Sequence, residues 1–352
     1  MTQKIYGIGL IGAGNIARTH AAAIAEIPNA RVVGVYDSSE AAGRACAEEL
    51  GGVAWTGDLD ELLDRDAVDI VNICTPSGTH AELAVAAAQA GKHLIVEKPL
   101  DVTLERADRI IAAAKENNVK LTGIFPYRFR VGAKKAKEAI QQGRLGRLVL
   151  ADVYVKWYRS QEYYHGWHGS WALDGGGALI NQSIHNIDLL QWLAGPVDTI
   201  VGHVATLGHV METEDTASAV LTFKNGALGV IQGATSCWPG DPARAEFHGA
   251  RGTIVLEEGR IVVWKLADGT PQEEQEMTSL EVQDGRAFAD PTAIAHVPHR
   301  RQIEDMLDAI EQDREPRVTG LEARKAIEII RAIYLSAQRG ERMRLPLTAR
   351  EA

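Results

Sequence analysis

Lys98 and His185 are the two residues of this sequence best suited to acid–base chemistry on a hydroxyl group. Lys98 stands between Glu97 and Pro99 after an expected strand, where its ammonium could hydrogen-bond a substrate hydroxyl and stabilise a developing alkoxide. A histidine titrates near neutral pH and could take the hydroxyl proton while a hydride leaves the same carbon. The alternatives are a solvated surface lysine and a core histidine satisfied by Asp188. The pair therefore supports a hypothesis of alcohol oxidation.

A glycine run precedes the expected helix that carries His185. Residues 175–177 are all glycine, which would let the following backbone approach a ligand closely. Asn181, His185 and Asp188 are spaced four and three residues apart, so they share one face if the helix begins near residue 180. We therefore expect Asn181 beside His185 in the catalytic group.

A dinucleotide-binding fingerprint occupies the segment 12–17, with the sequence Gly-Ala-Gly-Asn-Ile-Ala. It follows an expected strand and opens an expected helix, so Gly12 would form the tight turn and Gly14 would admit the pyrophosphate. Asp37 ends the next strand about twenty residues on, where a carboxylate can accept both ribose hydroxyls. Ser38 follows it rather than an arginine, which favours NAD over NADP. The alternative is a glycine-rich turn in a sheet that binds no nucleotide.

Two further segments come at the carboxyl ends of expected strands, where open α/β sheets bind their ligands. One is the run 74–80 and the other is 97–99. Together with the fingerprint they give the residues expected to contact the cofactor: Gly12, Gly14, Asn15, Ile16, Asp37, Ser38, Thr75, Pro76, His80, Glu97 and Lys98.

The first 124 residues alternate β-branched runs with alanine-rich segments of helical period, as in strand–helix–strand units around a parallel sheet. The strands are expected at 5–11, 31–36, 69–74, 93–96 and 120–124, and the helices at 16–26, 39–50, 80–90 and 104–117. Thr79 and Thr103 are expected N-caps, and Gly91 an expected helix stop.

After residue 125 the rhythm changes to successive strands joined by turns, which predicts an antiparallel or mixed sheet. The strands are expected at 147–157, 199–206, 216–223, 228–235, 243–248, 253–256 and 261–264. Helices are expected at 133–142, 184–193, 301–311 and 321–339, and a polar loop at 267–290. The predicted fold class is α/β: a Rossmann dinucleotide-binding domain (1–124) and an α+β domain (125–352) on a mostly antiparallel open sheet, for substrate binding and oligomerisation. The C-terminal helices of the second domain could pack back toward the first.

Composition excludes several classes of protein. The net charge of −10 over 352 residues disfavours nucleic acid as a partner, and no apolar run approaches the length of a membrane span. No secretory signal is visible, and three separated cysteines predict neither disulfides nor a zinc cluster, so a cytoplasmic protein is expected. His165 and His168 near Asp174 are a weak metal motif, and no metal is expected.

Aromatic residues are scarce, at 6% of the chain, yet seven of them lie between residues 154 and 171. Tyrosine and tryptophan offer flat apolar faces with a polar atom, which suits the stacking of sugar rings. Core packing is the alternative for Tyr154 and Trp157. Substrate contacts are expected from Tyr127, Tyr163, Trp167, Trp171, Asn181 and His185.

With these motifs the sequence resembles the glucose-fructose oxidoreductase/inositol dehydrogenase (Gfo/Idh/MocA) family along nearly its whole length. The resemblance implies an NAD(P)-dependent dehydrogenase of sugars, polyols or their derivatives, with Lys98 and His185 as the catalytic pair. It also implies a homodimer or homotetramer built on the C-terminal sheet. Many members carry aspartate where this chain has Asn181. An amide cannot relay a proton, so Asn181 is expected to position a substrate hydroxyl, which favours glycosides, anhydrosugars or nucleotide sugars over inositol.

The resulting prediction is NAD-dependent oxidation of a secondary sugar hydroxyl. Two alternatives stay open on these residues. One is a glycoside hydrolase that retains NAD and oxidises the ring transiently, and the other is a non-catalytic sugar or dinucleotide sensor. The sequence does not give the sugar, the oxidised carbon or the physiological direction.

Overall fold

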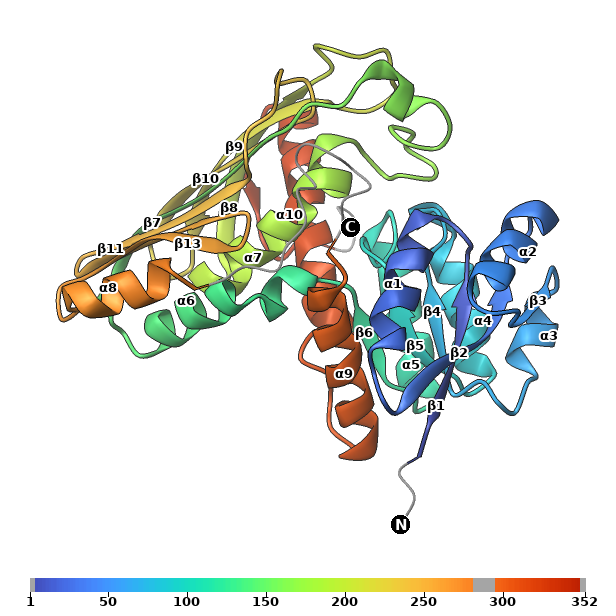
Figure 1. Ribbon diagram of the computed structural model, residues 1–352. Helices are drawn as coiled ribbons and strands as arrows, with labels where there is room; N and C mark the ends of the chain where they lie inside the picture. The colour runs from blue at the N-terminus through green and yellow to red at the C-terminus, as the bar shows by residue number, and fades with distance from the viewer. Residues whose placement is uncertain (1–3, 281–294, 349–352) are drawn as a thin grey trace. The chain divides into compact units, whose positions relative to one another are not determined.

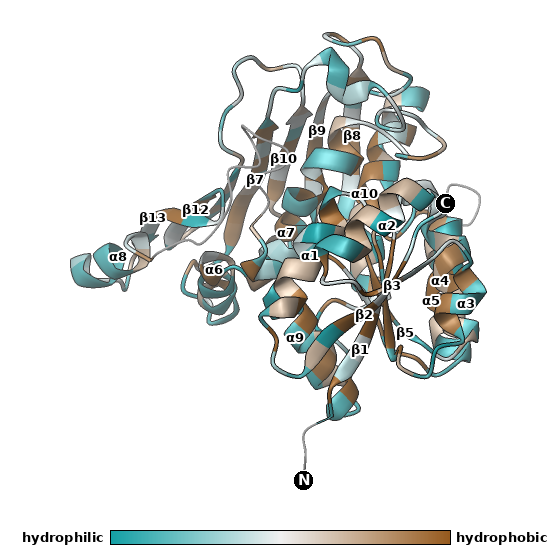
Figure 2. Cartoon of the chain, turned by 45° about the vertical axis from the view of Figure 1, so that its right-hand side comes forward, coloured by the Kyte–Doolittle hydropathy of each residue, from teal (hydrophilic) through white to brown (hydrophobic). Residues whose placement is uncertain are grey.

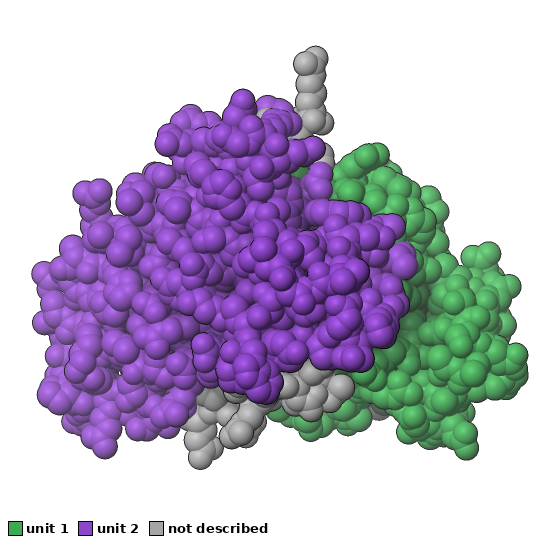
Figure 3. All heavy atoms as spheres, turned by 90° about the horizontal axis from the view of Figure 1, so that it is seen from above, with its two compact units in different colours: residues 1–124, 294–324 green, residues 125–293, 325–352 purple. Residues whose placement is uncertain are grey.

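The computed structural model describes residues 4–280 and 295–348, which form two compact units. Unit 1 comprises residues up to 124 together with 294–324, and unit 2 comprises 125–293 together with the chain from 325 onward, as coloured in Figure 3. Residues 294–324, which include the helix expected at 301–311, belong to unit 1. No helix of the described residues is long and apolar enough to cross a membrane.

Unit 1 is built on a six-stranded parallel sheet in the order β3-β2-β1-β4-β5-β6 (Figure 1). Its strands are β1 (Tyr6–Ile11), β2 (Ala30–Tyr36), β3 (Ala54–Thr56), β4 (Ile70–Ile73), β5 (His93–Val96) and β6 (Leu121–Gly123). Its helices are α1 (Asn15–Ala25), α2 (Glu40–Glu49), α3 (Leu59–Leu63), α4 (His80–Gln89), α5 (Leu104–Glu116) and α9 (Val297–Glu311). The strand order reverses between β1 and β4, which is where such sheets bind ligands.

The core of unit 1 joins the sheet to a helix from the far end of the chain. Ile8 and Leu10 of β1 are fully buried in the same cluster as Ile303 and Met306 of α9. In Figure 2 the central strands are mostly brown while the helices around them carry teal residues. The apolar stripe of α9 therefore completes this core, because a parallel sheet must be covered on both faces.

Unit 2 is built on an eight-stranded sheet in the order β13-β12-β11-β7-β10-β9-β8-β14. Its pairs are antiparallel except β7 with β10, as predicted for a mostly antiparallel sheet. The strands are β7 (Leu148–Lys156), β8 (Val197–Ala205), β9 (Thr216–Phe223), β10 (Leu228–Ala234), β11 (Arg244–Gly249), β12 (Gly252–Glu257), β13 (Arg260–Leu266) and β14 (Met343–Arg344).

The helices of unit 2 include a wide turn that the sequence did not predict. They are η2 (Pro126–Phe129), α6 (Val131–Gln141), η3 (Gln161–Tyr164), η4 (Ala178–Ser183), α7 (Ile184–Ala194) and α8 (Pro271–Thr278), and α10 (Gly320–Arg339) enters unit 2 at Lys325. η4 is a π-helix that runs directly into α7. π-helical turns are rare and occur often at functional sites.

Several local predictions need correction. The expected polar loop at 267–290 contains α8, and its part from 281 to 290 lies outside the described residues. Thr103 caps α5 as predicted, since its side chain accepts a hydrogen bond from Arg106 N. Thr79 occupies the N-cap position of α4 as predicted, but its side chain makes no capping hydrogen bond. Its hydroxyl donates instead within the turn η1 (Ser77–Thr79), where Thr75 and Pro76 lie within hydrogen-bond distance. β3 and α3 were missed because three and five residues are too few to show a period.

Candidate active site

The turn between β1 and α1 uses its two glycines for different reasons. Gly12 has φ +99°, and a Cβ there would lie 2.9 Å from the carbonyl carbon and oxygen of Cys74. Gly14 has an ordinary φ of −78°, and a Cβ there would meet no protein atom within 4 Å. The fold therefore needs glycine at position 12, whereas the open space beside Gly14 fits a pyrophosphate at the first turn of α1.

Asp37 lies at the end of β2 and closes over the same turn. Its Oδ2 accepts from Ala13 N at 2.8 Å, and its Oδ1 accepts from Ser39 N at 2.8 Å. Ser38 is exposed beside it, as is Asn15 at the first turn of α1, and Ile16 is partly buried. The carboxylate is thus fixed at the position where the fingerprint expects a ribose partner.

His80 is placed differently from its expected role as a cofactor contact. Its ring is fully buried, with Nδ1 at 3.0 Å from Pro99 O and Nε2 at 2.9 Å from Thr75 O. Both partners are carbonyl oxygens, which only accept, so both bonds form when both ring nitrogens carry hydrogen. His80 therefore ties the loop after β4 to the loop after β5 and holds Thr75 and Pro76 from behind.

Glu97, at the end of β5, is also buried. Its Oε1 lies 2.8 Å from His20 Nε2, and its Oε2 accepts from Lys98 N at 2.9 Å. Burial opposes ionisation of Glu97, but the hydrogen bond with His20 and the charges of His20, His299 and Lys98 outweigh it and lower its pKa to about 2. A buried anion therefore lies behind the backbone of Lys98 and fixes where that loop leaves the strand.

His20 and His299, which the sequence did not single out, complete this group in unit 1. Their rings meet edge to face with centroids 5.1 Å apart. With Glu97 they form the one set of three potential metal ligands in the part of the chain that the structure describes, within 4.8 Å of one another. The position of His20 on the helix of the fingerprint was the only signal in the sequence, and nothing marked His299 on α9.

His185 lies in the first turn of α7, in unit 2, on a platform of rings. Its ring stacks on Tyr127 with centroids 4.9 Å apart and meets the edge of Phe125 at 5.9 Å. The guanidinium of Arg130 lies 3.4 Å from the centroid of the Tyr127 ring. Tyr127, an expected substrate residue, is buried, and its ring packs against the ring of His185.

Asp188 has a different partner from the one its spacing suggested. Arg128 Nε and Nη2 donate to its two oxygens at 2.7 and 2.6 Å, and both side chains are buried. Asp188 is therefore held by Arg128, a partner that the spacing along one helix did not indicate. The Arg128–Asp188 pair fixes α7 to η2, which carries Tyr127.

Asn181 lies on η4 and belongs to a second polar group. Its Nδ2 donates to Asp174 Oδ1 at 2.7 Å and lies 3.2 Å from His168 Nδ1. The condition for a shared α-helical face of residues 181, 185 and 188 was a helix beginning near residue 180, but α7 begins at Ile184 and residues 178–183 form the π-helix η4. Asp174 and His168 were noticed in the sequence only as weak metal candidates.

The aromatic segment does form a cluster beside Asn181. The ring of His168 stacks on Tyr163 with centroids 4.4 Å apart, and it lies tilted by 37° against Trp167 with centroids 4.0 Å apart. Tyr163 is largely buried, which raises its pKa to about 12. Trp171 stands apart, 45% exposed, with its ring edge on Tyr334. The structure thus groups Tyr163 and Trp167 with Asn181.

Glu214 lies under the glycine run and was missed. Its carboxylate accepts from Gly177 N at 3.0 Å, Leu179 N at 2.9 Å and Tyr334 Oη at 3.0 Å. A Cβ on Gly177 would fall 1.8 Å from Glu214 O. Burial raises the pKa of Glu214 to about 7. The glycine run therefore serves close packing on Glu214, which holds the start of the π-helix.

These observations define a two-unit oxidoreductase with a dinucleotide-binding turn, a lysine at a neighbouring strand end and a histidine on a ring platform. Residues 6–125 match the family described as "Oxidoreductase family, NAD-binding Rossmann fold", and residues 133–255 match the "GFO/IDH/MocA C-terminal domain". The chain belongs to this GFO/IDH/MocA family of oxidoreductases. The predicted family, fold class and NAD cofactor are confirmed.

Known relatives fall into several substrate groups. The chain is 32% identical over 269 residues to myo-inositol 2-dehydrogenase of Thermotoga maritima, which covers 74% of this chain and 78% of that protein. It is 28% identical over 288 residues to levoglucosan dehydrogenase of Pseudarthrobacter phenanthrenivorans, covering 72% and 74%. Among solved structures, the WlbA dehydrogenase of Bordetella pertussis in complex with NADH and UDP-GlcNAcA has a TM-score of 0.89 at 32% identity, covering 99% of this chain and all of that one.

Proposed function

We propose that the protein oxidises a secondary hydroxyl of a sugar or sugar derivative, with NAD bound at the β1–α1 turn. The observation that carries the proposal is the space beside Gly14, which the protein itself leaves open. Asp37 closes this turn and would repel a 2'-phosphate, so we expect NAD to bind more tightly than NADP. When bound, NAD supplies the acceptor for the hydride.

Lys98 and His185 carry the acid–base roles in this proposal. His185 takes the proton of the substrate hydroxyl at a ring nitrogen, and the Tyr127 platform keeps its ring oriented. Lys98 donates a hydrogen bond to the substrate oxygen and stabilises its developing negative charge. The buried Glu97 anion and the His80 tie hold the Lys98 loop, so these two residues position the lysine rather than touch substrate.

The substrate side of the proposal rests on the aromatic cluster and Asn181. Tyr163 and Trp167 offer ring faces for the C–H faces of a sugar. Asn181 donates to Asp174, so its carbonyl oxygen is the atom that it would present to a sugar hydroxyl. The full-length likeness to WlbA at 32% identity favours a nucleotide-linked sugar such as UDP-GlcNAcA as the first substrate to test.

The decisive experiment measures reduced-nicotinamide absorbance with UDP-GlcNAcA, levoglucosan and myo-inositol, each with NAD and with NADP. NADH formation on one of these sugars that is lost in Lys98→Met supports the proposal. Equal turnover by Lys98→Met rejects the role of the lysine. Cleavage of a glycoside without net NADH would support the NAD-retaining hydrolase instead, and sugar binding without any turnover would support a sensor.

We also propose a cytoplasmic homodimer or homotetramer that uses the open face of the unit 2 sheet. Leu150 and Leu228 are direct neighbours in the β7–β10 register and are 41% and 51% exposed, and Val220 on β9 is 58% exposed. An exposed apolar sheet face of this kind marks an association surface. Light scattering should give a multiple of the 38.1 kDa chain mass, and Leu228→Glu should shift it toward the monomer. A monomeric wild type would reject this part.

A further inference from the structure

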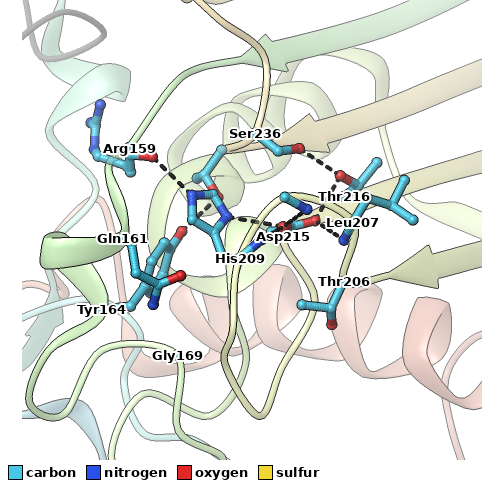
Figure 4. Close-up of polar contacts among 12 residues, drawn as sticks. Arg159, Gln161, Tyr164, Gly169, Thr206, Leu207, His209, Asp215, Thr216 and Ser236 are labelled. Atoms are coloured by element: carbon cyan, nitrogen blue, oxygen red, sulfur yellow. Dashed lines mark hydrogen bonds and ion pairs between the residues drawn. The ribbon is translucent and has the colours of Figure 1, made fainter.

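Asp215, at the start of β9, collects an unusual number of donors in unit 2 (Figure 4). Its Oδ1 accepts from Leu207 N and Thr216 Oγ1, each at 2.9 Å. Its Oδ2 accepts from Gly208 N at 2.7 Å, and from His209 N and Nδ1 at 3.0 and 2.9 Å. Burial opposes the charge, but these donors outweigh it and lower the pKa of Asp215. Asp215 is therefore a buried anion.

His209 is held at both ring nitrogens by groups that can only accept. Nδ1 faces the Asp215 carboxylate, and Nε2 lies 2.8 Å from Arg159 O (Figure 4). The ring thus spans the Asp215 carboxylate and the Arg159 carbonyl, and the His209 side chain is only 4% exposed. The centroid of the Tyr164 ring lies 4.7 Å from that of His209.

The contact from His209 to Arg159 O is one of four ties between two loops. The first loop, residues 158–174, carries Tyr163, Trp167 and His168, and we call it the aromatic loop. The second, residues 206–215, carries His209. Gln161 exchanges two hydrogen bonds with the backbone of Val210, at 2.9 and 3.0 Å, and Thr213 Oγ1 donates to Gly169 O at 3.1 Å. Trp171 N donates to Glu212 Oε2 at 3.0 Å. The ties at 159, 161, 169 and 171 flank the rings on both sides.

We propose that His209, anchored by Asp215, is a positioning residue that holds the aromatic loop in its sugar-binding shape. This inference rests on the proposed function, in which that loop stacks on the sugar. The His209 tie is anchored on the buried carboxylate of Asp215, whereas the Glu212 residue of the tie to Trp171 is exposed.

Two isosteric substitutions separate the two bonds of the ring. His209→Asn places an amide nitrogen near the position of Nδ1, where it can still donate to Asp215 but cannot reach Arg159 O. His209→Gln places one near Nε2, where it can donate to Arg159 O. His203→Asn changes an exposed histidine on β8 and serves as the control.

We expect His209→Asn to raise the KM for the sugar about tenfold or more, with kcat and the Kd for NADH little changed. His209→Gln should stay close to wild type at neutral pH. Equal KM values for both variants and wild type would overturn the proposal.

Hydrogen–deuterium exchange of the aromatic loop gives a readout that needs no substrate. In His209→Asn the amides of residues 161–169 should exchange at least several-fold faster than in wild type, while β7 and β10 stay protected. His209→Gln should restore slow exchange. Unchanged exchange in His209→Asn would refute the positioning role of His209 even if the enzyme oxidises sugars. If the enzyme oxidises no sugar, the exchange experiment still tests that positioning role.

Discussion

Replacing Gly14 by alanine separates what the fold requires from what the cofactor requires. The backbone at Gly14 has φ −78° and ψ −174°, which any residue adopts, and the added Cβ meets no protein atom within 4 Å. Alanine is a poorer N-cap than glycine by up to about 1 kcal/mol, but it lowers the entropy of the unfolded chain by about 0.4–1 kcal/mol. These effects oppose each other, so the free energy of unfolding should change by less than about 1 kcal/mol.

The same methyl group should weaken NADH binding. It projects into the open space at the first turn of α1, where the backbone must approach the pyrophosphate closely. Overpacking by one methyl group costs about 1–3 kcal/mol, which corresponds to a rise in the Kd for NADH of roughly tenfold to a hundredfold. Titration of tryptophan fluorescence or calorimetry measures this constant directly.

Gly12→Ala is the matched substitution two residues earlier. Its Cβ would lie 2.9 Å from the Cys74 carbonyl in a backbone with φ +99°, so steric overlap and backbone strain act together. Each costs about 1–3 kcal/mol, and urea unfolding should show a loss of stability of at least about 2 kcal/mol. If Gly14→Ala unfolds as readily as Gly12→Ala and binds NADH like wild type, the assignment of Gly14 to the cofactor is refuted.

Three further predictions concern single side chains. Lys98→Met should lower kcat by about 10²–10⁴-fold while the Kd for NADH stays within about threefold, and a steady-state kcat like that of wild type would contradict the role. Arg128→Met removes both charged donors from the buried Asp188 and should cost about 3–5 kcal/mol in urea unfolding; a loss below about 1 kcal/mol would show that the pair is not needed. Burial raises the pKa of Glu214 from its ordinary 4.5 to about 7, so between these pH values the folded state holds a proton that the unfolded state has released. The wild-type free energy of unfolding should therefore fall as pH rises between about 4.5 and 7, and Glu214→Gln should flatten this dependence in denaturant titrations at pH 5 and pH 7.5.

The parallel sheet of unit 1 could be predicted because its information is local. Each buried strand is an apolar run, and each following helix shows its own period. The position of α9 could not be predicted in this way. The sequence pattern of an amphipathic helix shows only that one face is apolar. It does not show which sheet Ile303 and Met306 cover. Only the folded chain shows that they complete the core around Ile8 and Leu10 of β1.

Local spacing also limits what could be predicted of the site. Spacing placed Asp188 near His185 on one helix, but Arg128, 60 residues away in sequence, takes both carboxylate oxygens. A guanidinium offers two parallel donors that match a carboxylate, so a buried anion can pair with a residue far away in the sequence.

The π-helix η4 also depends on a residue that is distant in the sequence. Glu214 accepts the amides of Gly177 and Leu179 before η4 is complete, and its backbone oxygen accepts the amide of Ala178. These three amides are thereby satisfied from outside the helix, which removes the constraint that they bond within a regular turn. The resulting wide turn directs Asn181 toward Asp174. A prediction of this geometry from sequence needs the partner of each early helical amide, and here that partner lies 35 to 37 residues later.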